Sequence, residues 1–320
     1  MIKNQSLTRF NRIDFSPYYY VMFLGIILCS CGNNLNRSNE TTIVDFTTID
    51  TLKVKNEYND TVQELNVAVS AIITPQRTFK YYQELFQFIS SKINYKIIFK
   101  QRKTYKEVNN LLRTGDVDIA FVCSGAYVDE KAVSNIEILV VPVCNGKPYY
   151  QAYIIANKNS QINSFIDLKG KSFAFTDPLS NTGKLYAEKR VAELGVDSKT
   201  FFLSTIYTHA HDISMQLVSK NLVAGATVDG LIFDYNAIFH PESVKNLKIV
   251  EKSEYFGIPP VVVPQGLDKN LKKQVRNILL TMHKDSVGKR ILDKLLIDKF
   301  IEGHDSDYDK IREINRELKR

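Results

Sequence analysis

A chain of 320 residues has room for about two domains of ordinary size. Hydrophobic residues make up 44% and charged residues 24%, which excludes a disordered tail and a collagen-like chain, and 4 cysteines exclude a small disulfide scaffold. The mean hydropathy of -0.18 excludes a protein with many membrane spans. The formal net charge of +7 is a modest excess, and the basic residues are scattered, so we predict no nucleic-acid partner.

Residues 1–30 have the pattern of a secretory signal. A basic segment is followed by an apolar run at residues 18–28 and then by small residues. The run is shorter than the roughly 20 residues that a membrane-spanning helix needs. The motif Leu-Cys-Ser-Cys that ends at Cys31 resembles a bacterial lipobox, which implies cleavage before Cys31 and a diacylglycerol on its sulfur. An uncleaved anchor helix is the alternative, and both interpretations tie the chain to a membrane, outside the cytoplasm.

Residues 31–64 are polar and show no sustained period, so we predict a flexible tether between the lipid and the folded body. In the body, apolar runs alternate with segments in which apolar residues recur every three or four positions, which predicts alternating strands and helices. The predicted strands are residues 66–73, 95–99, 118–122, 136–143, 150–156, 172–176, 201–206, 222–228 and 261–263. The predicted helices are residues 79–89, 105–112, 164–168, 183–194, 212–220, 269–283, 288–300 and 307–318.

This alternation, with short connections, predicts an α/β fold with mostly parallel sheets flanked by helices. It falls into two halves, which predicts two lobes. Residues 65–150 form the first part of lobe 1, residues 151–245 form lobe 2, and residues 246–320 return to lobe 1 and end in helices. Parallel sheets bind ligands beyond the carboxyl ends of their strands, and two lobes also enclose a cleft. Residues that directly follow strands are therefore the candidates for a site.

One such segment follows the predicted strand at residues 172–176. There an Asp-Pro pair turns the chain, and Ser180, Asn181 and Thr182 stand at the start of a helix. Free backbone N–H groups, two hydroxyls and an amide at this turn would suit an oxyanion. In the alternative interpretation, Ser180 or Thr182 is an ordinary helix cap.

His209 and His211 follow the next predicted strand, and each could donate an N–H to a ligand or have a structural role. As metal ligands they would need a third partner, and no Cys or Glu lies at metal-ligand spacing, so we predict no metal site and no cofactor. Asp229 closes a further strand. A carboxylate here would repel a phosphate dianion but accept a hydrogen bond from an oxygen that keeps its proton. Capping of the following helix is the alternative role of Asp229.

Several motifs together resemble the phosphonate-binding proteins of ABC importers, the substrate-binding components for phosphate, phosphite or phosphonate. They are Gly-x-x-Asp-x-Ala starting at Gly115, Ser-Gly-Ala-Tyr ending at Tyr127, the segment from Asp167 that leads to Asp-Pro-x-Ser-x-Thr-Gly, and Val-x-Gly-Ala-x-Val-Asp ending at Asp229. The resemblance spans about residues 66–317, in order and at the expected spacing. It implies a two-lobed type II periplasmic binding protein, here in a lipid-anchored form. Such a protein is a monomer that binds a small phosphorus oxyanion between its lobes and passes it to a permease and an ATPase.

The resemblance also implies a set of ligand-binding residues. The anion loop falls on Ser180, Asn181 and Thr182, the cleft histidine on His211, the acidic acceptor on Asp229 and the cleft tyrosines on Tyr105 and Tyr150, with Tyr127 in the cleft wall. Two departures leave the choice among phosphonate, phosphite and phosphate open: Asn181 stands where members often have a hydroxyl, and Ala224 where they usually have Asp. Cys123 stands at a common Gly position, and Cys123 and Cys144 could pair or remain two buried thiols.

Three classes of function compete. The favoured one is an extracytoplasmic receptor that delivers its ligand to an importer. The second is a ligand sensor for a separate signalling partner, or a binding protein of the same fold with altered ligand specificity. The third is an enzyme, for which the chain lacks both Gly-x-Ser-x-Gly and His-Glu-x-x-His, so we predict no catalysis.

Overall fold

The computed structural model describes residues 52–53, 63–70 and 74–319. Outside these residues lie the predicted signal at residues 1–30, Cys31 and nearly all of the predicted tether. Within the described part of the chain, no helix combines the length and the apolar character that crossing a bilayer requires.

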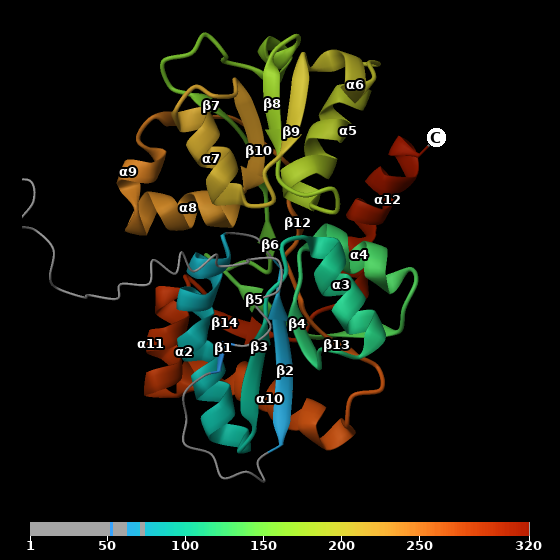
Figure 1. Ribbon diagram of the computed structural model, residues 1–320, viewed down its shortest axis with the longest axis vertical. Helices are drawn as coiled ribbons and strands as arrows, with labels where there is room; N and C mark the ends of the chain where they lie inside the picture. Colours follow the sequence, from blue (N-terminus) through green and yellow to red (C-terminus); the bar gives the residue numbers. More distant parts are fainter. Residues whose placement is uncertain (1–51, 54–62, 71–73, 320) are drawn as a thin grey trace, which may run out of the picture. The chain divides into compact units, whose positions relative to one another are not determined.

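A seven-stranded mixed sheet and the helices around it form lobe 1 (Figure 1). The strand order is β1-β3-β2-β4-β13-β5-β14. These strands are β1 (Leu52–Lys53), β2 (Glu64–Val69), β3 (Lys96–Lys100), β4 (Ile119–Phe121), β5 (Ile136–Val143), β13 (Val261–Pro264) and β14 (Lys299–Ile301). The helices are α2 (Pro75–Ile93), α3 (Tyr105–Thr114), α4 (Ser124–Lys131), α10 (Lys269–Thr281) and α11 (Ser286–Lys294). The C-terminal helix α12 (Asp309–Leu318) contacts α4 and also α5 of the other lobe.

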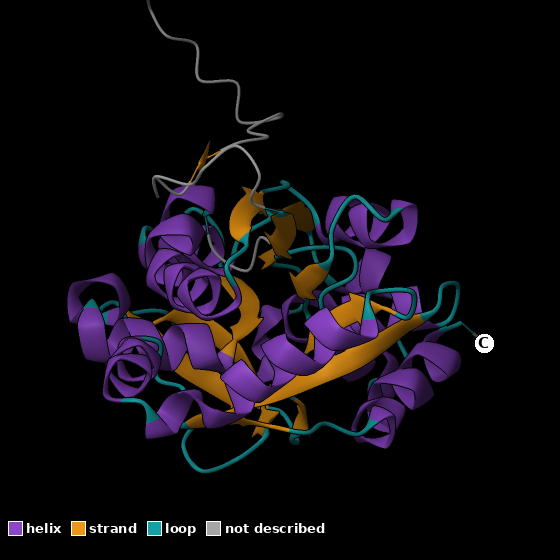
Figure 2. Cartoon of the chain, turned by 90° about the horizontal axis from the view of Figure 1, so that it is seen from below, coloured by secondary structure: helices purple, strands orange, loops and turns teal. Residues whose placement is uncertain are grey.

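A five-stranded mixed sheet forms lobe 2, with the order β11-β7-β10-β8-β9. Its strands are β7 (Ala152–Asn157), β8 (Ser172–Phe175), β9 (Ser204–Tyr207), β10 (Gly225–Asp229) and β11 (Leu247–Lys252). Its helices are α5 (Tyr186–Glu193), α6 (Ser198–Phe201), α7 (His211–Ser219), α8 (Gly230–Phe239) and α9 (Pro241–Val244). Figure 2 shows helices packed on both faces of the sheets, and accordingly all six residues of β7 are buried.

A two-stranded ribbon joins the lobes. In it, β6 (Tyr149–Tyr150) pairs antiparallel with β12 (Phe256–Gly257), between the two sheets in Figure 1. The predicted two-lobed α/β architecture is confirmed. The sheets are mixed rather than mostly parallel, because the strands nearest the two lobe crossovers pair antiparallel. These pairs are β5 with β13 in lobe 1 and β7 with β11 in lobe 2.

The return to lobe 1 comes later than the predicted residue 246. Strand β11 pairs antiparallel with β7, so it still belongs to the sheet of lobe 2. The sequence Leu-Lys-Ile-Val-Glu-Lys of β11 is mostly half-buried and carries charges, which weakens the strand pattern in the sequence.

Two other predicted elements differ in kind or position. The predicted helix at residues 288–300 stops at Lys294, because Leu296 adopts a left-handed φ of 55° and the chain then forms β14 against β5. The predicted strand at residues 201–206 begins later, at Ser204, because the preceding residues form the short helix α6.

Helix α3 shows how local chemistry positions a side chain between the lobes. The Thr104 hydroxyl accepts from the backbone N–H of Glu107, and the Glu107 carboxylate accepts from the N–H of Thr104, which forms a capping box. Gly115 ends the helix with a φ of 77°, a conformation that favours glycine. These two ends fix Tyr105 in the first turn, at the surface of lobe 1 that faces lobe 2.

Candidate functional site

Most of the predicted site residues lie at strand ends or helix starts between the two sheets. We call this group the anion site: Tyr105 of lobe 1, Tyr150 of the ribbon, and Ser180, Asn181, Thr182, His211 and Asp229 of lobe 2. The exposed fraction of each is 3% or less. The group contains no Lys or Arg, so any anion held there would be met by neutral donors.

The loop after β8 forms a tight turn that presents its side chains. Ser180 is an N-cap, because its hydroxyl oxygen accepts from the N–H of Gly183 at 2.9 Å, and a π-helical turn at Asn181–Leu185 leads into α5. Gly183 allows this packing, since a Cβ there would lie 2.5 Å from the Cβ of Thr176. The cap and the anion-binding interpretations are compatible for Ser180, because an accepting hydroxyl still has its own proton to donate.

Buried hydroxyls without a hydrogen-bond partner come from both lobes. Among the described residues they include the hydroxyls of Tyr105, Thr182 and Ser70. A buried polar group left unpaired costs about 1–3 kcal/mol, so such groups point to a ligand that completes them. Ser70 was missed by the sequence analysis. It directly follows β2, and its N–H donates to the carbonyl of Phe121 at the end of β4.

The amide of Asn181 has one engaged end and one free end. Its Nδ2 donates to the Tyr150 hydroxyl at 3.3 Å, while Oδ1 is buried without a partner. The two ends of an amide have nearly the same shape. In the reversed orientation the Tyr150 hydroxyl donates to Oδ1, and the NH2 group is free to donate. An anion in the site would stabilise that reversed orientation, so Asn181 can replace a hydroxyl as a donor.

His211 is a neutral donor. Its Nδ1 accepts from the backbone N–H of Asp229 at 3.0 Å, so the ring proton is on Nε2. Burial lowers the pKa of His211 to about 3, which keeps the ring uncharged at neutral pH. His209 is not part of the group; its Nδ1 lies 3.7 Å from an oxygen of Asp177. No cluster of three possible metal ligands occurs among the described His, Cys, Asp and Glu residues.

Asp229 combines both roles considered from the sequence. One carboxylate oxygen accepts from the N–H of Leu231 at 2.8 Å and caps α8. Burial raises the pKa of Asp229 to about 7, although backbone donors at Leu231 and Ile232 oppose the shift. The side chain therefore exchanges a proton near neutral pH, where phosphorus oxyanions also titrate.

The two cleft tyrosines stay protonated. Burial raises the pKa of Tyr105 and of Tyr150 well above the ordinary value for a phenol. Each is thus a neutral O–H donor on an apolar ring, and when the Asn181 amide is reversed the single proton of Tyr150 goes to Asn181.

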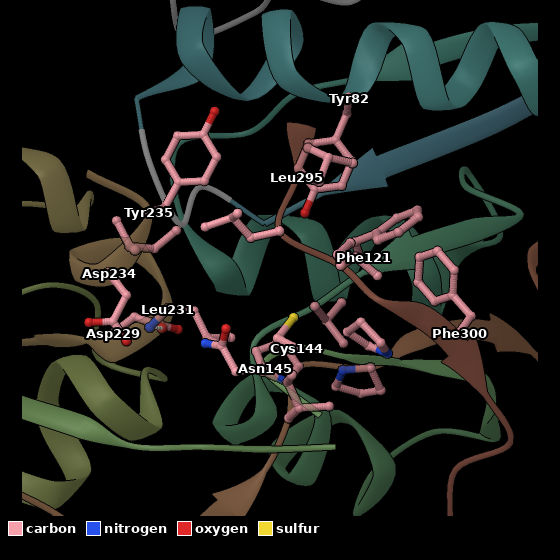
Figure 3. A pocket seen from close by; sticks show the side chains of 18 residues that line it. Tyr82, Phe121, Cys144, Asn145, Asp229, Leu231, Asp234, Tyr235, Leu295 and Phe300 are labelled. Atoms are coloured by element: carbon pink, nitrogen blue, oxygen red, sulfur yellow. Dashed lines mark hydrogen bonds between the residues drawn. The ribbon is translucent and has the colours of Figure 1, made fainter. Parts of the chain in front are cut away.

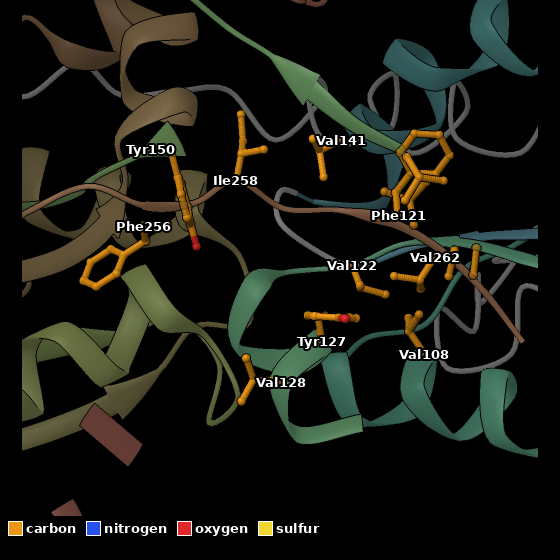
Figure 4. Close-up of a cluster of buried hydrophobic side chains, with 14 of the residues drawn as sticks. Val108, Phe121, Val122, Tyr127, Val128, Val141, Tyr150, Phe256, Ile258 and Val262 are labelled. Carbon is orange, nitrogen blue, oxygen red and sulfur yellow. The ribbon is translucent and has the colours of Figure 1, made fainter. Parts of the chain in front are cut away.

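The hydroxyl of Tyr127 is engaged outside this group. It donates to the Asp305 carboxylate at 2.5 Å, and the ring packs on Tyr308 with 4.7 Å between ring centroids. Tyr127 and Tyr150 belong to the same buried apolar cluster. Figure 4 shows Tyr127 on α4 and Tyr150 on the side of the cluster nearest the ribbon. The motif match thus brought Tyr127 into the predicted set, but the structure gives its hydroxyl a partner within lobe 1.

Two carboxylates of lobe 2 hold the starts of two helices of lobe 1. Asp177 accepts from the N–H of Tyr105 at 3.1 Å. Asp212 accepts from the N–H of Thr74 at 3.2 Å and from its hydroxyl at 3.1 Å, at the N-terminus of α2. Such charge-assisted bonds across the cleft hold the lobes together.

Cys123 and Cys144 are both buried and free. Burial raises the pKa of the Cys123 thiol and raises that of Cys144 to about 12, so both remain thiols. The Cys123 sulfur lies 3.9 Å from the Ser180 hydroxyl, which places it against the anion loop.

Comparison with known proteins finds a matching family and relatives of low sequence identity. The family model described as "ABC transporter, phosphonate, periplasmic substrate-binding protein" matches residues 67–308. The probable ABC transporter phosphite binding protein PhnD1 of Prochlorococcus marinus is 22% identical over 218 residues, which cover 64% of this chain and 73% of the relative. The phosphonates-binding periplasmic protein of Escherichia coli is 24% identical over 236 residues, which cover 72% of this chain and 70% of the relative.

Solved structures share the fold. The structure of the Prochlorococcus PhnD1 in complex with methylphosphonate has a TM-score of 0.74 at 20% identity, covering 80% of this chain and 98% of that chain. A binding protein component of an ABC phosphonate transporter from Pseudomonas aeruginosa has a TM-score of 0.77 at 23% identity, covering 81% and 87%. At these identities the likeness establishes the fold alone, and that fold is the predicted type II periplasmic binding protein.

Proposed function

This chain belongs to the family of periplasmic substrate-binding proteins of phosphonate ABC transporters, and we propose that it captures one phosphorus oxyanion between its two lobes. The resemblance predicted from the motifs is confirmed by the family match. Proteins of this family act outside the cytoplasm and supply a permease and an ATPase with their substrate. The relatives named above bind phosphite or phosphonates, and we propose a phosphonate, phosphite or phosphate as the ligand here.

The observation that carries the proposal is the set of buried, unpartnered donors. The hydroxyls of Tyr105 and Thr182 come from opposite lobes and are both unsatisfied. A phosphorus oxyanion presents several oxygens in a tetrahedral arrangement, and each can accept such a bond. Binding would then remove the cost of the unpaired groups and draw the lobes together.

The same residues favour an anion that keeps one proton. Neutral donors leave part of the ligand charge uncompensated, and Asp229 lies beside them with a raised pKa. Either the ligand donates its proton to the Asp229 carboxylate, or protonated Asp229 donates to the ligand. Sulfate carries no proton at neutral pH, so it can use only the second arrangement and should bind more weakly.

Calorimetric titration of the purified protein with phosphate, phosphite, methylphosphonate and sulfate tests this function. We expect 1:1 binding of at least one phosphorus oxyanion and weaker binding of sulfate. We also expect no chemical change of the bound ligand, which phosphorus NMR of the recovered ligand would detect. If none of the phosphorus oxyanions binds, the proposed function is wrong.

We further propose that the protein is a lipoprotein anchored through Cys31, with residues 1–30 removed. This rests on the lipobox-like motif alone. The test is labelling of expressing bacteria with a fatty acid that carries a reporter group. Label on the wild type and none on Cys31→Ser would support the anchor, and equal label on both would contradict it.

A further inference from the structure

The side chain of Cys123 makes no hydrogen bond to the helix that it precedes. It occupies the N-cap position of α4, where a side-chain oxygen usually accepts from a backbone N–H of the first turn. The Cys123 side chain makes no such bond. Its exposed fraction is 2%, so the thiol is not exposed to bulk water either. The sulfur is therefore available for a contact outside α4.

That contact is with the anion loop of lobe 2. The Cys123 sulfur lies 3.9 Å from the Ser180 hydroxyl oxygen, within the range of hydrogen bonds to sulfur. Gly125 lets the start of α4 approach this loop, because a Cβ there would overlap the carbonyl oxygen of Leu179. Cys123 thus connects lobe 1 with the loop that we propose holds the anion.

The protons and lone pairs of the two groups determine the direction of this bond once an anion is present. The Ser180 oxygen has two lone pairs and one proton, and one lone pair accepts from the N–H of Gly183 at 2.9 Å. When the Ser180 proton is donated to an anion, only the second lone pair is left to face the sulfur. Burial raises the pKa of the Cys123 thiol, although the backbone N–H groups of Asn181 and Gly125 oppose the shift. The thiol therefore keeps a proton that it can donate to Ser180.

A second observation points to a ligand beside this contact. Cys123 packs with Tyr105 and Ala126 in a small buried cluster. The Tyr105 hydroxyl in that cluster is buried without a hydrogen-bond partner. Because buried polar groups are almost always paired, this hydroxyl indicates a missing partner next to the thiol.

We propose that Cys123 is a positioning residue for the anion: its S–H donates to the Ser180 oxygen, and the Ser180 hydroxyl donates its own proton to the ligand. This inference rests on the proposed function and goes beyond it, because it assigns a role to a residue that stands at a common Gly position of the family. Hydrogen bonds in such a chain polarise one another, so the thiol should strengthen the bond from Ser180 to the anion. A glycine has no side chain that could make this contribution.

Calorimetry on the purified full chain measures the contribution, with phosphate, phosphite and methylphosphonate as probes. Cys123→Ala removes the donor, so the dissociation constant of an anion that binds should rise about two- to tenfold. Cys123→Ser keeps a donor at this position and should restore most of the lost affinity. In a Ser180→Ala background, Cys123→Ala should change the dissociation constant by less than about twofold, because the thiol acts through the Ser180 hydroxyl.

Infrared spectroscopy at saturating anion gives a second readout that does not depend on affinity. The S–H stretching band moves to lower frequency when the thiol donates a stronger hydrogen bond, so the Cys123 band should move down when the anion binds. Cys123→Ala identifies this band by its loss, and the movement should vanish in Ser180→Ala. The reference is the band of Cys144, a buried thiol that lines a cavity with Leu231 and Leu295 (Figure 3), and Cys144→Ala identifies it.

The outcomes separate this inference from the proposed function. If an anion binds but the Cys123 band does not move, or if Cys123→Ala binds it as tightly as wild type, the positioning role is overturned and the proposed function stands. The same holds if Cys123→Ala loses equal affinity with and without the Ser180 hydroxyl, because the thiol would then not act through Ser180. If none of the three anions binds, both proposals are overturned.

Discussion

The two lobes contribute to the anion site in different ways. Lobe 2 supplies the loop at Ser180, His211 and Asp229, and each lies at or shortly after the carboxyl end of a strand of one sheet. Lobe 1 supplies scattered donors such as Ser70 and Tyr105, and two helix starts that the carboxylates of lobe 2 hold. We propose that lobe 2 forms most of the surface that contacts the ligand and that lobe 1 covers it. The predictions below test each half of this proposal.

The largest effect should come from Asp229, which ends β10 beside His211. Burial raises its pKa from 3.8 to about 7. The folded protein therefore keeps this proton at pH values where the unfolded chain has lost it. The stability that results is complete below about pH 3.8 and is lost as the pH rises through about 7. In Asp229→Asn the side chain cannot ionise, yet it keeps an oxygen for the N–H of Leu231. Between about pH 4 and pH 8, its unfolding free energy should therefore gain a few kcal/mol relative to wild type.

Urea unfolding of the ligand-free protein at several pH values measures this change. The control is Asp129→Asn, which removes an exposed carboxylate of lobe 1 and should give a curve parallel to that of wild type. If the Asp229→Asn curve is also parallel to wild type, Asp229 does not hold its proton in the folded state, and its proposed part in selecting a protonated ligand fails.

The next effect should come from Thr182, whose hydroxyl is buried without a partner. Thr182→Val keeps the shape and removes the hydroxyl. A hydrogen bond to a charged oxygen contributes about 1.5–3 kcal/mol, so the dissociation constant should rise about 10- to 150-fold. The ligand-free protein should be as stable as wild type or more stable, because an unpaired group has been removed. Calorimetry and urea unfolding measure the two quantities.

Thr205→Val on the exposed strand β9 is the matched control for both measurements. A loss of stability in Thr182→Val without a loss of affinity would show that the hydroxyl has a structural role and does not contact the ligand.

The lobe 2 part of the anion site was predictable from the sequence for a physical reason. Ser180, His211 and Asp229 each follow a strand of the same sheet, and the carboxyl ends of parallel strands meet at one edge. Ser70 has the same kind of position, but the apolar run of the sequence continues to residue 73, so the strand end at Val69 was not visible. The partner of the Tyr127 hydroxyl, Asp305, is remote in sequence and could come only from the structure.

Closure by lobe 1 is tested by Asp212, which accepts two hydrogen bonds from Thr74 across the cleft. Asp212→Asn keeps one acceptor oxygen but removes the charge that strengthens these bonds. We expect a loss of about 0.5–1.5 kcal/mol in the closed state, seen as dissociation of the ligand that is about two- to tenfold faster. Stopped-flow measurement of ligand release would detect it.

Asp309→Asn, on the exposed face of α12, is the control and should release the ligand at the wild-type rate. If Asp212→Asn also releases it at that rate, the bonds to Thr74 do not stabilise the ligand-bound arrangement.

The smallest effect on binding should come from Tyr127. Comparing it with Tyr105 distinguishes lobe 1 residues that contact the ligand from those that only stabilise the lobe. Tyr127→Phe and Tyr105→Phe make the same chemical change, the removal of one buried phenol hydroxyl. In Tyr127 that hydroxyl is bound to Asp305, so its loss should lower the unfolding free energy by about 0.5–1.5 kcal/mol and change the dissociation constant by less than about twofold. In Tyr105 the hydroxyl has no partner, so its loss should weaken ligand binding and leave the protein as stable as wild type or more stable. If both variants weaken binding equally, Tyr127 reaches the ligand as the motif resemblance implies, and the assignment of its hydroxyl to the interior of lobe 1 is wrong.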